Sequence, residues 1–126
     1  MKARALAYLR DCRGTTAVEF AIVGPVLVML IIGVFYVGLL LFSLGSMHFA
    51  VEDAARCASV KTAVCTSHTT TEAYALDQFF ASSVLTPTFV STNASCGHRV
   101  TATASFDLNI GTDGFTVPLT AAACFP

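Results

Sequence analysis

Residues 20–42 read FAIVGPVLVMLIIGVFYVGLLLF and contain no charged side chain. At about 1.5 Å per residue, a helix of this length covers about 35 Å, more than the roughly 30 Å hydrocarbon core of a bilayer. Backbone groups in lipid must be satisfied internally, so we expect a membrane-spanning helix that tolerates Pro25 near its edge. One alternative is a cleaved secretory signal, whose apolar core is shorter, about 7–15 residues. Another is a buried helix of a soluble protein, although little chain is left to cover it.

The composition argues against an ordinary soluble domain. Of the 126 residues, 12% are charged, whereas soluble domains average about 25%. The net charge of −1 leaves no basic surplus for phosphates, so we expect no nucleic-acid partner. No Ser/His/Asp, Cys/His or paired-carboxylate set has a spacing that stands out from chance, and no Gly-rich phosphate loop occurs. The sequence therefore predicts no enzyme, no cofactor and no metal, with a membrane-bound redox protein as the rival interpretation.

Charge is distributed unevenly along the chain. Residues 1–14 contain four basic and one acidic side chain, a net of +3, and the rest of the chain carries 3 basic and 7 acidic side chains, a net of −4. The positive-inside rule places residues 1–14 in the cytoplasm and residues 43–126 outside. We expect a basic leader at 1–14, the transmembrane part of a long helix at 15–42 and an external domain at 43–126, anchored once in the lipid of the cytoplasmic membrane.

An acidic residue stands at the entrance to the apolar segment. Glu19 is the only charged residue between Gly14 and the far side of the membrane. A charge at the centre of a membrane helix costs about 2.5–3.5 kcal/mol, and less near the interface, so such a residue is a functional candidate by default. The alternative is an interfacial glutamate whose carboxylate simply reaches the water.

The spacing around Glu19 resembles the processing site of type IV pilin-like precursors: a glycine, four variable residues, then glutamate and an apolar residue. In that family a membrane peptidase cuts directly after the glycine. The resemblance implies a cut after Gly14, which leaves Thr15 as the new N-terminus. The Glu19 carboxylate can then pair with the Thr15 ammonium of a neighbouring subunit, and burial in lipid strengthens that attraction and sets the register between subunits. Phe20 completes the motif.

A longer stretch, RGTTAVEFAIVGPVLVMLIIGVFYVGLLLF at residues 13–42, resembles the TadE-like family, and the resemblance continues to about residue 60. It implies a minor pilin or pseudopilin of a tight adherence (Flp) pilus system, acting in pilus assembly or anchoring, surface adhesion and biofilm formation. The implied partners are a prepilin peptidase, other pilin-like subunits and the pilus assembly platform. Whether the protein enters the fibre or stays at its base is left open. One departure is Phe42-Ser43-Leu44, where family members often have a polar or acidic residue in the apolar run. The alternative is an unprocessed single-pass anchor that presents an external binding domain.

The helix is predicted to continue beyond the membrane to about residue 63. A stripe of apolar residues recurs at three- and four-residue steps and marks one face: Leu44, Met47, Val51, Ala54 and Ala58. We expect this stripe to cover the protein's own sheet, with contact to neighbouring subunits as the alternative. A long helix that lies half in lipid and half under a domain is typical of pilin-like assemblies.

The remaining chain predicts a short helix and a small antiparallel sheet, and hence an α+β fold. A Thr within residues 66–71 is expected to cap a helix that runs to about Ser83, with Tyr74, Leu76, Phe79 and Phe80 making it amphipathic. The alternation of apolar residues predicts strands at 88–92, 99–108 and 115–122, with a turn at 109–114. Pro118 places the last strand at an edge or near its end.

Five cysteines occur, one of which, Cys12, lies in the leader. An even number in an external domain indicates two disulfides, for which three connectivities exist. A hairpin turning near residues 109–113 brings Cys96 opposite Cys124, which leaves Cys57 to pair with Cys65. The rival interpretation is a zinc site formed by these cysteines with His68 and His98. It lacks the C-x-x-C spacing of common zinc sites and would lie in an oxidising compartment.

Overall fold

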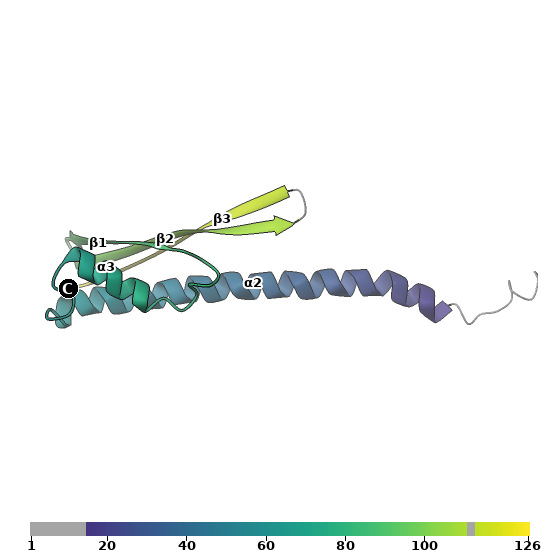
Figure 1. Cartoon of the computed structure of the whole chain (residues 1–126), viewed down its shortest axis with the longest axis horizontal. Helices are drawn as coiled ribbons and strands as arrows, with labels where there is room; N and C mark the ends of the chain where they lie inside the picture. Colours follow the sequence, from purple (N-terminus) through teal and green to yellow (C-terminus); the bar gives the residue numbers. More distant parts are fainter. Residues whose placement is uncertain (1–14, 111–112) are drawn as a thin grey trace, which may run out of the picture. The chain divides into compact units, whose positions relative to one another are not determined.

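The structure is a computed structural model that describes residues 15–110 and 113–126 (Figure 1). In chain order, its elements are α2 (Thr15–Val60), α3 (His68–Asp77), β1 (Thr88–Ala94), β2 (Gly97–Ile110) and β3 (Asp113–Phe125). The predicted fold class, a long N-terminal helix with a small disulfide-stapled antiparallel sheet, is confirmed. The expected leader at 1–14 lies outside the described residues.

The chain divides into two compact units, and the division falls within α2 between Val37 and Gly38. Among the described residues, the first unit contains only helix. The second unit contains the rest of α2, together with α3 and the sheet. The helix ends at Val60, slightly earlier than expected, because the amides of Val64 and Cys65 both donate to the carbonyl of Lys61 and form a turn.

The core of the second unit forms around the outer part of α2. Met47, Val51 and Ala54 are completely buried, Ala58 is nearly so, and Leu44 is half-buried. The predicted apolar stripe is therefore confirmed as the face that the helix turns towards its own domain. The sheet contributes the alternating residues of one face: Val100, Ala102, Phe106, Leu119 and Ala121.

The three strands form one antiparallel sheet in the order β1-β2-β3. All three strands are longer than the sequence predicts. Strand β1 pairs with β2 only as far as Thr88 opposite Thr103, whereas β2 and β3 continue to Ile110 opposite Asp113. Beyond Thr103 the sheet is therefore a two-stranded ribbon. Pro118 lies in the edge strand β3, as predicted, opposite Ser105 of β2. Proline is tolerated in edge strands because it lacks the N–H needed between two neighbours.

The short helix differs from expectation at both ends. Its N-cap is Ser67 rather than a threonine, and it ends at Asp77 rather than near Ser83. Ala75 and Phe79 face the core, whereas Leu76 and Phe80 are 55% and 64% exposed. The early end has a physical reason: the backbone amide of Phe80 donates to the Ser46 hydroxyl at 2.8 Å, which draws this segment back towards α2.

Candidate functional site

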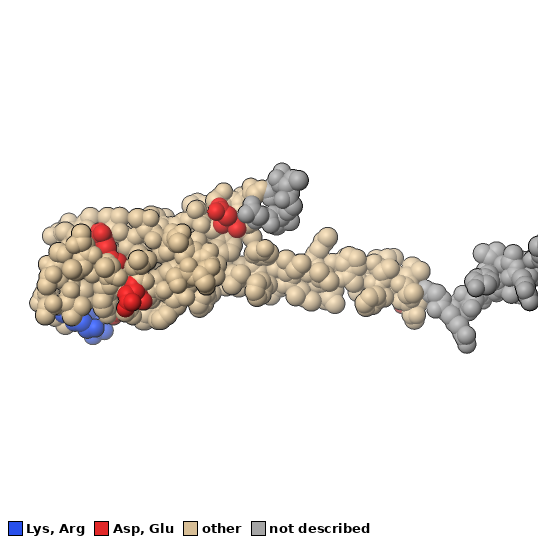
Figure 2. Space-filling view, viewed as in Figure 1, with Lys and Arg blue, Asp and Glu red and all other residues tan. Residues whose placement is uncertain are grey.

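The first unit presents an apolar surface with no protein to cover it. More than half of the surface of these side chains is exposed: Val18, Phe20, Ile22, Val23, Val26, Leu27, Val28, Met29, Leu30, Ile31, Val34, Phe35 and Val37. Among the described residues, one helix is long and apolar enough to cross a membrane, and it is α2. On the face shown in Figure 2 this part of α2 has no Lys or Arg. Such a surface is suited to lipid or to other apolar helices and not to water.

Glu19 lies at the beginning of this apolar surface. It is four residues after Thr15, the first residue of α2, so the two positions are one helical turn apart. The Glu19 side chain is exposed, as is Phe20 beside it. The structure thus presents a carboxylate and an aromatic ring at the surface of the helix near its N-terminus. Gly14, the residue before the expected cut, lies outside the described residues.

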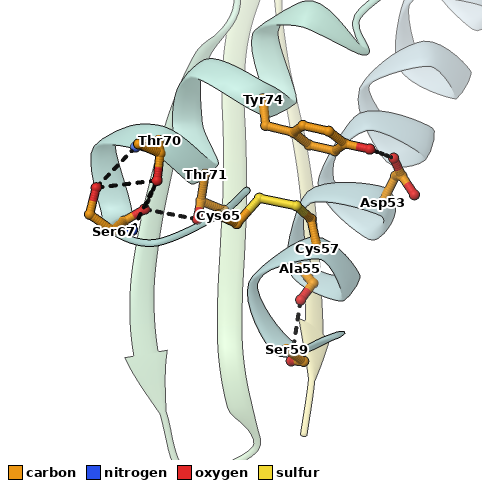
Figure 3. Close-up of a disulfide and its surroundings, with 9 residues drawn as sticks. All are labelled: Asp53, Ala55, Cys57, Ser59, Cys65, Ser67, Thr70, Thr71 and Tyr74. Carbon is orange, nitrogen blue, oxygen red and sulfur yellow. Dashed lines mark hydrogen bonds between the residues drawn. A yellow bond between two sulfur atoms is a disulfide. The ribbon is translucent and has the colours of Figure 1, made fainter. Parts of the chain in front are cut away.

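A disulfide closes the outer end of α2. Cys57, in the last turns of the helix, is bonded to Cys65 in the following loop, with the Cα atoms 5.9 Å apart. Both cysteines are buried, and together with Ala58 they form a small core against which Tyr74 of α3 packs (Figure 3). The bond fixes the direction in which the chain leaves the long helix.

The N-terminus of α3 begins directly after this disulfide. The amide of Thr70 donates to the Ser67 hydroxyl, and the amide of Ser67 donates to the Thr70 hydroxyl, so each side chain satisfies a free backbone N–H of the other (Figure 3). Such reciprocal capping satisfies two donors that would otherwise lack a partner in the helix. The cap therefore starts α3 at a defined distance from Cys65.

A hydrogen bond connects α3 to the outer part of α2. The Tyr74 hydroxyl donates to Oδ2 of Asp53 at 2.7 Å (Figure 3). This hydrogen bond raises the pKa of the Tyr74 phenol, and burial and the charge of Asp53 act in the same direction. The Lys61 ammonium lies 5.8 Å from the centroid of the Tyr74 ring, and its charge acts in the opposite direction. The neutral phenol is thereby favoured as the donor that holds the two helices together.

The second disulfide joins Cys96, in the turn between β1 and β2, to Cys124 near the end of β3, with the Cα atoms 6.2 Å apart. Both disulfides join the pairs that the spacing favours. Gly97, directly after Cys96, has a φ of +117°, which is strained for a residue with a Cβ atom. A Cβ at this position would lie only 2.3 Å from the carbonyl oxygen of Phe125, so the end of β3 depends on the glycine.

The zinc interpretation involved the cysteines together with His68 and His98. Nδ1 of His68 lies 3.1 Å from the Ser91 hydroxyl, and Cys57, Cys65, Cys96 and Cys124 are all in disulfides. Both histidines line a pocket beside Cys65. Within residues 15–110 and 113–126, no group of three His, Cys, Asp or Glu side chains could hold a metal ion. An open groove of about 570 Å³ lies between α2 and the end of β3, lined in part by Glu52 and Arg56.

Several of these contacts could not be found from the sequence. The pairs Tyr74–Asp53, Ser46–Phe80 and Ser59–Phe125 join residues far apart in the chain, and none of them belongs to a recognisable motif. One available signal was the pair of serines, Ser43 and Ser46, which interrupts the apolar run where the helix leaves the expected membrane segment. Both are buried, and the Ser43 hydroxyl donates to the carbonyl of Leu39.

Within the described residues, these features combine one helix that is long and apolar enough to cross a membrane with a small, disulfide-stapled α+β domain. The family model described as TadE-like protein matches residues 14–56, and the resemblance seen in the sequence is thereby confirmed. The match begins at Gly14 and ends on the outer part of α2, so it includes Glu19 and the apolar surface but not the sheet. No curated protein and no solved structure matches the chain. Similarity to TadE-like proteins indicates a protein associated with a Tad pilus.

Proposed function

We propose that this protein is a minor pilin or pseudopilin of a Tad (Flp) pilus system that acts in pilus assembly or anchoring and in surface adhesion. The observation that carries the proposal is the coincidence of the TadE-like match with a helix whose apolar side chains are exposed from Val18 onward. Such a helix can hold the protein in a bilayer as a monomer, and it can pack against similar helices when subunits assemble.

The proposed precursor is inserted with residues 1–14 in the cytoplasm and is cut by a prepilin peptidase between Gly14 and Thr15. The cut creates an ammonium group at the start of α2, one helical turn from the Glu19 carboxylate. In a medium of low dielectric constant, a carboxylate and an ammonium attract each other far more strongly than in water, and an unpaired charge is costly. Pairing between neighbouring subunits would therefore select one axial register.

The two disulfides support the proposed orientation. Disulfides form and persist in oxidising compartments, and all four bonded cysteines lie in the expected external domain at 43–126. The four basic residues of the leader favour its retention on the cytoplasmic side. The domain organisation that follows is a removable leader, a transmembrane part at 15–42 and an external domain.

Cleavage is tested by intact-mass measurement of the protein extracted from membranes of the cell that makes it. We expect the mass of the chain without residues 1–14 and with both disulfides intact. A Gly14→Leu variant should keep the leader, because a bulky side chain obstructs approach to the backbone. A parent protein that retains Met1–Gly14 in its native cell would contradict the proposal and favour an unprocessed single-pass anchor.

The role of Glu19 is tested by co-purification of tagged and untagged copies from detergent extracts. Glu19→Gln keeps the size of the side chain but removes its charge, and we expect it to lower co-purification while membrane insertion is unchanged. Glu52→Gln is the matched control, because Glu52 is an exposed glutamate on the outer part of the same helix. Equal behaviour of the two variants would contradict a register role for Glu19.

A further inference from the structure

The outer part of α2 has one face that its own domain leaves uncovered. Met47, Val51 and Ala54 mark the buried side of the helix. Gly45 is nine residues before Ala54, which is about two and a half turns of an α-helix, so it lies on the opposite side. Gly45 is exposed, and a Cβ at this position would meet no atom within 4 Å. This side of the helix is therefore open to another molecule.

Two rows of residues run along this uncovered face, and each row repeats every seven residues. All six residues are exposed: the first row is Phe42, Phe49 and Arg56, and the second row is Gly38, Gly45 and Glu52. The steps between the rows alternate between four and three residues, as in the seam of a coiled coil. The first row has two large rings and a positive charge, whereas the second has two glycines beside open space and a negative charge.

A bilayer that ends at Phe42, as expected, covers only the beginning of this face. The interfacial region of a bilayer adds about 5–7 Å on each side, whereas Phe49 lies about 10 Å beyond Phe42 along the helix. Phe49 is 49% exposed, and its ring centroid is 5.6 Å from that of Phe80, which is 64% exposed. Two exposed rings in contact form an apolar surface outside the lipid, and such a surface is suited to a protein partner.

The two rows are complementary to each other, so the partner that fits this face is a second copy of the chain. Insertion in one membrane makes the α2 helices of two copies parallel. When one copy is displaced by four residues, about 6 Å along the axis, Phe42 and Phe49 face the two glycines of the neighbouring copy. The same displacement brings Arg56 opposite Glu52 of that copy. Glycine lets two helices approach closely, and the ring opposite fills the space beside it.

Other displacements do not match the two rows. Without displacement, Arg56 of one copy faces Arg56 of the other, and like charges repel. A displacement of three residues in the opposite direction places the ring of Phe49 opposite the carboxylate of Glu52. The displacement of four residues therefore fits best, because it joins opposite charges and fills both open spaces at once.

We propose that neighbouring copies of the protein associate in parallel along this face of α2, with a displacement of four residues. The pairing of Glu19 with the Thr15 ammonium of a neighbouring subunit requires the same displacement, because Thr15 is four residues before Glu19. Two contacts far apart in the chain thus specify one register. Since the first row of one copy binds the second row of the next, the contact is head-to-tail and can repeat from copy to copy. The inference rests on the proposed function and adds the contact face outside the membrane.

Charge reversal tests the pairing of Arg56 with Glu52. Tagged and untagged full-length copies are produced together, extracted in mild detergent and co-purified through the tag. When all copies carry Arg56→Glu, or all carry Glu52→Arg, like charges meet, and we expect co-purification to fall about ten-fold. When tagged Arg56→Glu copies are combined with untagged Glu52→Arg copies, opposite charges meet again and co-purification should return, which also shows that both variants fold.

Matched controls separate this pairing from a general effect of charge. Arg99→Glu and Asp77→Arg reverse exposed charges outside α2 and should not lower co-purification. Glu52→Gln should change it little, because glutamine still accepts a hydrogen bond from Arg56 and an exposed ion pair contributes little.

The register is measured with the photo-crosslinking residue p-benzoylphenylalanine in place of Phe49. Mass spectrometry of mixed isotope-labelled and unlabelled copies locates the crosslinks between copies, and we expect them around Gly45. The inference is overturned if either reversal leaves co-purification unchanged, if the mixed pair does not recover, or if the crosslinks centre on residue 49 or 52. The proposed function survives these results when co-purification of the parent still depends on Glu19. Parent copies that do not co-purify at all would contradict the proposed assembly and this inference with it.

Discussion

Replacement of Gly97 by alanine is expected to destabilise the α+β domain strongly. With φ at +117°, Gly97 occupies a backbone region that residues with a Cβ rarely adopt. The alanine Cβ would lie 2.3 Å from the Phe125 oxygen and 2.6 Å from the Pro126 Cα. Both are backbone atoms, so the end of β3 must move.

The magnitude has three contributions. A residue held in an unfavourable backbone region costs about 1–3 kcal/mol. Displacement of the end of β3 weakens the pairing of His98 with Phe125 and the hydrogen bond from Ser59 to Phe125, at about 0.5–1.5 kcal/mol per hydrogen bond. Against these, Ala lowers the entropy of the unfolded chain and returns about 0.4–1 kcal/mol. We therefore expect Gly97→Ala to lower the free energy of unfolding by about 3 kcal/mol, the sum of the central values of these terms.

The assay is urea unfolding of the full oxidised chain in detergent, followed by circular dichroism of the sheet and of the tyrosines. Gly45→Ala is the matched control, because it makes the same chemical change within α2, where a Cβ meets no atom within 4 Å. Alanine exceeds glycine in helix propensity by about 0.8–1 kcal/mol, so Gly45→Ala should be neutral or stabilising. Equal midpoints for Gly97→Ala and the parent would refute the reasoning.

Three further predictions concern the stability of the α+β domain. The Tyr74→Phe variant should be less stable than the parent at neutral pH, because the raised folded pKa of Tyr74 stabilises the parent below the unfolded pKa near 10. This contribution is lost as the pH rises through the folded pKa. The free energies of unfolding of the two proteins, measured against pH, should therefore converge at high pH. Ser67→Ala removes the N-cap of α3 and should cost about 1 kcal/mol in a urea titration, whereas a cost near zero would mean that water replaces the cap. Replacing both Cys96 and Cys124 by serine should cost about 3–4 kcal/mol by the loop-closure estimate, and an unchanged midpoint would show that the end of β3 is held by pairing alone.

The sequence predicted those features that depend on patterns within a single segment. The uncharged run at 20–42 predicted the long helix, and the period of Met47, Val51 and Ala54 predicted which face of it is buried. Alternation at Val100, Ala102 and Phe106 predicted the core face of β2. In each case the pattern arises because one side of the helix or strand faces an apolar environment along its whole length, so apolar residues recur with the period of that element.

The features that were missed depend on contacts between segments. The residues Leu76 and Phe80 were expected to form the apolar face of the short helix, but the Ser46 hydroxyl binds the amide of Phe80, and the helix ends at Asp77. Strands β2 and β3 pair with each other as far as Ile110 and Asp113, well beyond the last residue that β1 pairs with, Thr103. This length depends on pairing between two segments and not on a pattern within either one. The Gly/Asp-rich stretch at 109–114 was expected to form a turn, whereas its residues 109–110 and 113–114 belong to β2 and β3, and residues 111–112 lie outside the described residues.

The candidate site divides in the same way. The cysteine pairs followed from their spacing and from the expected hairpin. Glu19 was singled out by its position before the apolar run and by the resemblance to pilin-like precursors, and its role stays a prediction. The Asp53–Tyr74 hydrogen bond could not be found, since nothing in either segment specifies the other.

The two disulfides form separate rings that do not overlap in the chain: residues 57–65 form one ring and residues 96–124 the other. No disulfide therefore connects the part of the chain that contains the anchor helix with the part that contains the paired strands β2 and β3. A single peptide-bond cleavage between Cys65 and Cys96 would leave only non-covalent contacts between them, even in the fully oxidised protein. After such a cut, a denaturant or a mechanical pull would separate the paired strands from α2 without any reducing agent.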